Sequence, residues 1–159
     1  MIKYFVLSAL VIITSACGWQ LRGIVVLPSS IQVMTLESQA SNRFNQRLRM
    51  QLEFNGVTLL DDGSANVRLQ IEPIEIERLT LSVNSAGQDA EYELSAQLNA
   101  RLIALEEEAD VSWEISGRRT FNNDVNSVIG TQNEEKIQRQ ELENDLIRKL
   151  MIRLQKVKL

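Results

Sequence analysis

The chain has 159 residues and a net charge of −4, and its 44% hydrophobic and 24% charged residues are ordinary values for a globular protein. It contains no histidine and a single cysteine. These counts exclude a Ser-His-Asp or Cys-His catalytic site, a histidine metal site and an internal disulfide. The acidic balance also argues against nucleic-acid binding, which depends on a basic surface.

The N-terminal segment has the pattern of a secretory signal peptide. Lys3 supplies a positive charge, and Tyr4–Ile13 form an apolar run of ten residues with one serine. This run is too short to span a bilayer, which needs roughly 20 apolar residues. Cys17 directly follows Thr14-Ser15-Ala16, an arrangement that looks like a bacterial lipobox with threonine in the usual leucine position. We therefore expect cleavage of residues 1–16 and lipidation of Cys17; the alternative is an ordinary secretory signal beside a chance cysteine.

Lipidation would make the mature chain a membrane-anchored protein, since two or more acyl chains anchor stably. In the lipoprotein sorting pattern that this segment resembles, aspartate after the cysteine favours the inner membrane; Gly18 stands there, which favours the outer membrane. Removal of residues 1–16 leaves 143 residues with a net charge of −5, because Lys3 is lost. That length suits one domain. We expect a lipidated arm at residues 17–27 and a single domain at residues 28–159.

The first half of the domain predicts a strand and a helix. A partly alternating segment at residues 31–37 predicts the first strand. Capping residues at 38–41 then precede an apolar repeat of Phe44, Leu48 and Leu52, and Asn55-Gly56 ends the helix as a C′ glycine does.

Three further strands and a second helix complete the predicted elements. Residues 67–83 predict a strand bent near Pro73, with Leu79, Leu81 and Val83 on the same face as Val67. A turn at 84–88 leads to the clearest period-two alternation in the chain, at 92–102, and the last strand follows at 111–121. A polar loop at 122–132 leads to a helix at about 133–156, whose buried stripe we expect to be Ile137, Leu142, Leu146, Ile147, Leu150, Met151 and Leu154.

The order β-α-β-β-β-α predicts an α+β fold. We expect a two-layer sandwich in which both amphipathic helices pack on one face of a four-stranded, mostly antiparallel (mixed) sheet. The opposite face would then carry polar residues such as Glu91, Glu93 and Gln97 and could face water or a wet partner wall.

Several landmarks occur in the order found in one known family. The chain resembles the LptE (RlpB) family of lipopolysaccharide-assembly lipoproteins through Cys17-Gly18-Trp19-Gln20-Leu21-Arg22-Gly23, Leu27-Pro28-Ser29-Ser30, Asn55-Gly56-Val57, Leu59-Leu60-Asp61, Gly87-Gln88-Asp89-Ala90-Glu91-Tyr92 and Leu146-Ile147-Arg148-Lys149-Leu150. The resemblance implies a non-enzymatic protein without a cofactor. It further implies a domain on the periplasmic side or in the lumen of the outer-membrane β-barrel LptD, which it plugs and helps to assemble. Together the two proteins would deliver lipopolysaccharide to the outer leaflet.

The resemblance also directs attention to two loops. We expect the partner surface to include the hairpin turn and the loop before the last helix, at Ser85, Ala86, Gly87, Val128 and Ile129. Family contacts with lipopolysaccharide involve basic residues near these loops, but residues 84–88 and 122–132 contain no lysine or arginine here. The nearby cations that could bind phosphate instead are Arg78, Arg101, Arg118, Arg119 and Lys136, of which we select Arg78, Arg118, Arg119 and Lys136; each could equally be a solvated charge.

Two other classes of function remain open at this stage. The chain could be a general outer-membrane assembly or envelope-sensing lipoprotein without a role in lipopolysaccharide delivery. A hydrolase that uses carboxylates alone would need two acids roughly 5–10 Å apart, one of them in an apolar pocket. The acids here alternate on strand faces or cluster in the turn at 106–110, which favours solvated charges over catalysis or calcium binding.

Overall fold

The computed structural model describes residues 27–106 and 108–158. Cys17, the signal segment and almost all of the expected arm lie outside these ranges. The elements, in chain order, are a 3-10 helix η1 (Ser29–Ile31), β1 (Val33–Ser38), α2 (Asn42–Phe54), β2 (Thr58–Leu59), β3 (Val67–Ile71), β4 (Ile76–Val83), β5 (Asp89–Ala104), β6 (Ala109–Asn122) and α3 (Val128–Gln155).

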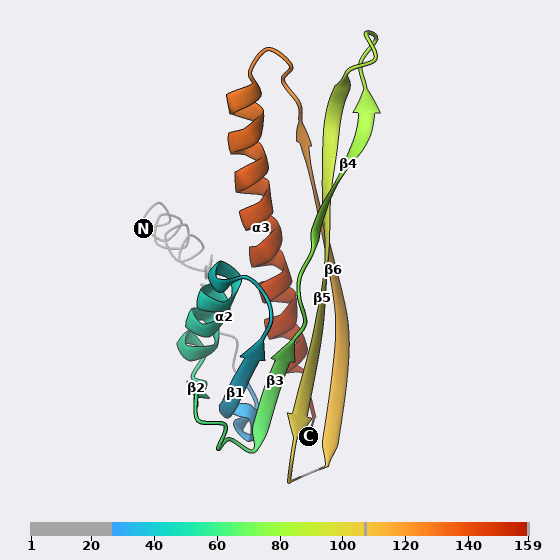
Figure 1. Cartoon of the computed structure of the whole chain (residues 1–159). Coiled ribbons are helices and arrows are strands. Elements are labelled where there is room, and N and C mark those ends of the chain that lie inside the picture. The colour runs from blue at the N-terminus through green and yellow to red at the C-terminus, as the bar shows by residue number, and fades with distance from the viewer. Residues whose placement is uncertain (1–26, 107, 159) are drawn as a thin grey trace, which may run out of the picture.

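The strands form one mixed sheet with β5 at its centre. β2, β1 and β3 are neighbours in that order. β3 and β4 pair with successive parts of one edge of β5, at residues 100–104 and 89–96, and β6 pairs with the other edge at residues 91–104. β1 is parallel to β2 and β3, whereas β3, β4 and β6 are all antiparallel to β5. Both helices lie on the same side of the sheet (Figure 1), and Arg47 of α2 forms an ion pair with Glu143 of α3 at 3.1 Å. The predicted α+β fold is confirmed, but the sheet has six strands rather than four.

α2 has the ends and the buried stripe that its sequence predicts. The Ser41 hydroxyl accepts a hydrogen bond from the Phe44 amide at 3.3 Å, which satisfies one free amide of the first turn. Gly56 has φ +85°, and the Val57 amide donates to the Leu52 carbonyl at 3.1 Å, which closes the C-terminal turn. Phe44, Leu48 and Leu52 are buried, so this helix contributes one apolar face to the core.

α3 starts five residues earlier than the sequence predicts. Its first residue is Val128, so half of the expected loop at 122–132 is helical. The buried stripe is confirmed from Leu142 to Leu154, where the helix covers β5 and β6. Ile137 was expected in that stripe but is 52% exposed. The first half of α3 therefore does not share the apolar packing of the second half.

The break between β3 and β4 changes which residues face the helices. Ile71 pairs with Ala100 and Ile76 with Ala96, so residues 72–75 lie opposite the three residues 97–99. One extra residue reverses the alternation, as a β-bulge does. The expectation that Leu79, Leu81 and Val83 continue the buried face was wrong, because they are 52, 53 and 60% exposed.

The long strands β5 and β6 follow the predicted alternation. Leu94, Leu98 and Leu102 are buried beneath the helices, while Glu91, Gln97 and Ser116 are exposed on the opposite face, called here the bare face. Within residues 27–106 and 108–158, no helix is both long enough and apolar enough to cross a membrane.

Candidate functional site

The β4–β5 turn is exposed but well ordered by its own hydrogen bonds. The Asn84 side-chain oxygen accepts from the amides of Ala86 at 2.9 Å and Gln88 at 3.0 Å. Gly87 has φ +77°, a conformation that glycine adopts without steric cost. The turn therefore presents Ser85, Ala86 and Gly87 on a defined backbone, as an interaction surface requires.

The loop before α3 is fastened beside this turn. The Asn123 amide donates to the Ala90 carbonyl, and its side-chain amide donates to the Asp89 carbonyl, both at 2.8 Å. Both loops lie at the same end of the molecule in Figure 1. We call residues 83–89 and 122–129 the hairpin end.

Several exposed apolar side chains lie together at the hairpin end. Val128 and Ile129, which the sequence selects as partner contacts, are 63 and 75% exposed, and Val83 is 60% exposed. Apolar residues exposed together usually mark an interaction site. The structure thus brings the five selected partner residues to one end, on two segments separated by about 40 residues.

The four selected cations do not form one site. Arg78 and Arg119 project from the helix-facing side of the sheet, and Lys136 lies on α3. Arg118 lies on the bare face, where it lines a groove with Glu75 and Glu77. A single phosphate group therefore cannot contact all four residues.

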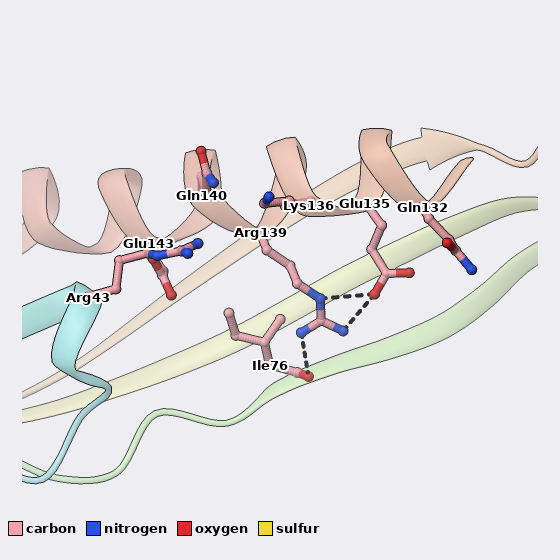
Figure 2. Close-up of a pocket in the computed structure, with 8 residues that line it drawn as sticks. All are labelled: Arg43, Ile76, Gln132, Glu135, Lys136, Arg139, Gln140 and Glu143. Atoms are coloured by element: carbon pink, nitrogen blue, oxygen red, sulfur yellow. Dashed lines mark hydrogen bonds and ion pairs between the residues drawn. The ribbon is translucent and has the colours of Figure 1, made fainter. Parts of the chain in front are cut away.

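A groove of about 400 Å³ lies between α3, the start of α2 and β4 (Figure 2). Glu135 and Arg139 extend from α3 toward β4 in this view, and Arg139 Nη1 donates to the Ile76 carbonyl at 3.4 Å. The groove is lined by Arg43, Ile76, Gln132, Glu135, Lys136, Arg139, Gln140 and Glu143. Its lining holds three cations and two acids, so it is a polar seam and has no single strong charge.

Glu135 is the centre of this seam. Its carboxylate contacts Arg139 Nη2 at 2.8 Å and Arg78 Nη1 at 2.9 Å. Burial opposes the charged form of Glu135, but the hydrogen bonds and attraction of the two arginines outweigh it, so the pKa of its carboxyl is lowered from the usual value. Arg78 also lies 4.8 Å above the ring centroid of Tyr92, a cation–π arrangement. Arg78 is thus already engaged within the protein.

A second acid lies in the middle of α3, where the helix faces β6. Asp145 is 6% exposed and contacts Lys149 Nζ at 2.9 Å and the guanidinium of Arg148. Burial raises its pKa, but the hydrogen bond and charge of Lys149, with the charges of Arg148 and Arg119, outweigh that effect and lower it. Arg119 makes no ion pair in the described part of the chain, but its charge acts on Asp145 and its Nη1 donates to the Arg118 carbonyl at 3.3 Å. Of the four selected cations, only the side chains of Lys136 and Arg118 have neither an ion pair nor a hydrogen bond among the described contacts.

Sequence reasoning missed Glu135 and Arg139 as seam residues. The available signal was their spacing of four, which places an acid and a base on one helix face. That spacing is common on solvated helices. Only the packing of α3 against β4 shows that Arg78 joins the pair.

The described residues hold no group of three or more His, Cys, Asp or Glu side chains arranged to bind a metal ion. What the fold presents instead is a polar seam, a bare sheet face and an exposed apolar end. These features are those of an α+β domain with surfaces suited to binding.

A family model described as Lipopolysaccharide-assembly, LptE, matches residues 29–154, and the chain belongs to that family. It is therefore a non-enzymatic lipopolysaccharide-assembly protein. The LPS-assembly lipoprotein LptE of Pectobacterium atrosepticum is 28% identical over 153 residues, which cover 92% of this chain and 83% of that protein. The protein of the same name from Photorhabdus laumondii is 33% identical over 99 residues, which cover 61% of this chain and 54% of that one.

Solved structures share the fold. The rare lipoprotein B of Shewanella oneidensis has a TM-score of 0.63 at 22% identity, over 75% of this chain and 91% of that one. A lipoprotein B of Nitrosomonas europaea has a TM-score of 0.67 at 20% identity, over 84% of this chain and 88% of that one. The arrangement of helices and sheet predicted from the sequence is therefore one that other lipoproteins adopt.

Proposed function

We propose that the chain is an outer-membrane lipoprotein, anchored through acylated Cys17, that inserts into the lumen of the LptD β-barrel. There it would plug the barrel, assist its assembly and take part in lipopolysaccharide delivery to the outer leaflet. Family membership supports the role in lipopolysaccharide assembly. The names of the relatives as lipoproteins support the anchor.

The observation that carries the partner proposal is the exposed hairpin end. Val128 and Ile129 are the first two residues of α3 but contribute little to the hydrophobic core, since they are 63 and 75% exposed. Each would bury apolar surface against a barrel wall, at roughly 25 cal/mol per Å² removed from water. The ordered turn at 84–88 adds backbone groups that a wall could contact.

For lipopolysaccharide itself, the structure favours two of the four selected cations. Lys136 on the helix side and Arg118 on the bare face have no ion pair in the described residues, so either can contact a phosphate without breaking an internal contact. Arg78 would first have to leave Glu135. We therefore rank Lys136 and Arg118 above Arg78 and Arg119.

Site-specific photocrosslinking in cells tests the partner proposal. A photoreactive residue at Ser85, Ala86 or Val128 should give an adduct with LptD. Ser30, exposed in η1 at the opposite end, provides the matched control position. If the hairpin-end positions give no adduct while Ser30 captures a different envelope protein, the plug assignment is wrong. Capture of general assembly components from the hairpin end would favour the alternative assembly role.

A further inference from the structure

The second half of α3 and the residues after it form a strongly basic segment. Residues 145–158 contain five cations and one acid, a net charge of +4 in a chain whose total is −4. The cations are Arg148, Lys149, Arg153, Lys156 and Lys158.

Internal contacts neutralise only part of this charge. Asp145 holds Arg148 and Lys149, and Lys149 Nζ also donates to the Ser116 carbonyl at 2.7 Å. Arg153, Lys156 and Lys158 make no ion pair or side-chain hydrogen bond with any described residue. These three charges are free for an external anion.

The basic segment lines a groove along the free edge of β6. Lys149, Ile152, Arg153 and Lys156 form one wall, and Glu114, Ile115 and Ser116 the other, around about 480 Å³. The four helix residues have the spacing i, i+3, i+4 and i+7, which places them in one row on the helix. Ile152 is 40% exposed within that row. We call these four residues with Lys158 the basic row.

The helix dipole explains only some of these cations. Basic residues in the last turn of a helix are favourable there, which accounts for Arg153. Lys158 lies beyond the helix, and an exposed isoleucine gains nothing from the dipole. A row that combines cations with an apolar side chain is instead typical of a helix lying at a membrane surface.

The basic row lies at the end of the chain that the anchor would reach. The end of α3 and the short helix η1 lie together at the end of the molecule opposite the hairpin (Figure 1). Leu27, the first described residue, stands ten positions after Cys17, so even a fully extended arm spans at most about 36 Å. An acylated Cys17 would therefore keep the basic row within reach of the headgroup layer.

We propose that the basic row docks on the anionic phosphates of phospholipid headgroups in the membrane that anchors the chain. This inference rests on the proposed anchor. Docking would be a second attachment beside the lipid and would set the direction of the long axis of the molecule relative to the bilayer. Each basic residue near an anionic surface contributes about 1 kcal/mol, a change of about fivefold in the docking equilibrium.

The test uses the purified lipidated chain in vesicles. A dye on Gln155→Cys, an exposed position in the last helical turn, reports the approach of a quencher carried on lipid headgroups. Vesicles of phosphatidylcholine alone are compared with vesicles that also contain phosphatidylglycerol. We expect stronger quenching in the anionic vesicles, and its loss at high salt, because salt screens the attraction.

Two triple variants that change the net charge equally distinguish docking through the basic row from a general effect of the net charge. Arg153→Gln with Lys156→Gln and Lys158→Gln should reduce docking by about fivefold for each cation removed. Arg43→Gln with Arg49→Gln and Arg68→Gln removes three cations that lie outside both the basic row and the selected lipopolysaccharide cations, and should retain docking. Equal quenching in the two vesicles, or an equal loss in both variants, overturns the proposal. Docking that requires lipopolysaccharide in the vesicle also overturns it.

A failure of the proposed lipid anchor is detected separately from a failure of docking by the basic row. Mass spectrometry of the same sample shows whether Cys17 carries acyl groups. If it does not, the proposed anchor is wrong, and the labelled chain is added to preformed vesicles. Sedimentation with phosphatidylglycerol vesicles would then support the basic row, and its absence would refute it.

Discussion

Glu135 joins two structural elements by charge where most of the domain uses apolar contacts. Its carboxylate accepts from Arg139 on the same helix and from Arg78 on β4. The side chain of Glu135 is 17% exposed, whereas those of the arginines are 38 and 48% exposed. Such a partly solvated network contributes modestly to stability but fixes the position of α3 relative to β4.

Glu135→Gln should lower the free energy of unfolding by about 1 kcal/mol at neutral pH, since hydrogen bonds to a charged group are lost. The folded pKa of Glu135 is lower than the unfolded one. The stabilisation is therefore fully present above the ordinary pKa of glutamate and is lost as the pH falls through the lower, folded value. Urea unfolding at neutral and acidic pH checks this. A difference from the wild type that persists in acid would mean that the carboxylate charge is not the cause.

Cys17→Ala tests the anchor at the level of one atom, the thiol sulfur that would carry the lipid. Wild-type protein should take up an acyl label in cells, and the variant should not. The observation behind this expectation is the position of the only cysteine directly after Thr14-Ser15-Ala16. Acyl label on the variant, or a native mature N-terminus upstream of Cys17, would refute the proposed lipidation of Cys17.

At the scale of elements, α3 has two halves with different roles. Leu142, Leu146 and Leu150 are fully buried, and Gly117 of β6 lets the helix approach closely, since a Cβ there would lie 2.7 Å from Leu142 Cδ1. The first half instead meets the sheet through the polar seam around Glu135. The second half therefore stabilises the fold through apolar packing, while the first half is positioned beside β4 by polar contacts.

Leu146→Ala or Leu150→Ala should each cost roughly 2–5 kcal/mol, because both side chains are fully buried and leave a cavity. Ile137→Ala provides the control on the same helix. Ile137 is 52% exposed, so its truncation should change stability by no more than about 0.5 kcal/mol. Denaturant unfolding of the three variants measures the difference. Equal losses at all three positions would refute this division of α3.

At the scale of the whole molecule, the two ends differ in surface chemistry. The hairpin end exposes apolar residues at the end of β4 and the start of α3, and the other end carries the basic row. The core, which includes Phe44, Leu98 and Leu146, holds both helices on one face of the sheet. This arrangement leaves the hairpin end free to change without loss of the fold.

Val128→Asp combined with Ile129→Asp should abolish capture of the barrel partner while leaving the fold intact. Both side chains are largely exposed, so the substitutions should change the free energy of unfolding by about 0.5 kcal/mol or less. A charge buried against a partner wall without a counter-ion is costly. Pull-down from cells and thermal unfolding, performed on the same protein, check both parts. A variant that still captures the partner places the contact elsewhere.

The sequence alone determined the elements whose signals are local. Ser41 and Gly56 mark the ends of α2 because capping depends on neighbouring backbone groups. The alternation in β5 follows from the two-residue period of a strand with one buried face. Family landmarks in their order identified the family, and the lipobox pattern leads to the Cys17 proposal.

Tertiary structure decided what depends on distant partners. The residues from 123 to 132 are locally compatible with either a polar loop or a helix. In the structure α3 starts at Val128, after two hydrogen bonds fasten Asn123 to β5. The exposure of Leu79 follows from one extra residue between β3 and β4, which can be counted only against the paired residues of β5. Arg118 and Arg119 are neighbours in the sequence but face opposite sides of the sheet, so whether either can meet Lys136 depends on where the helix packs.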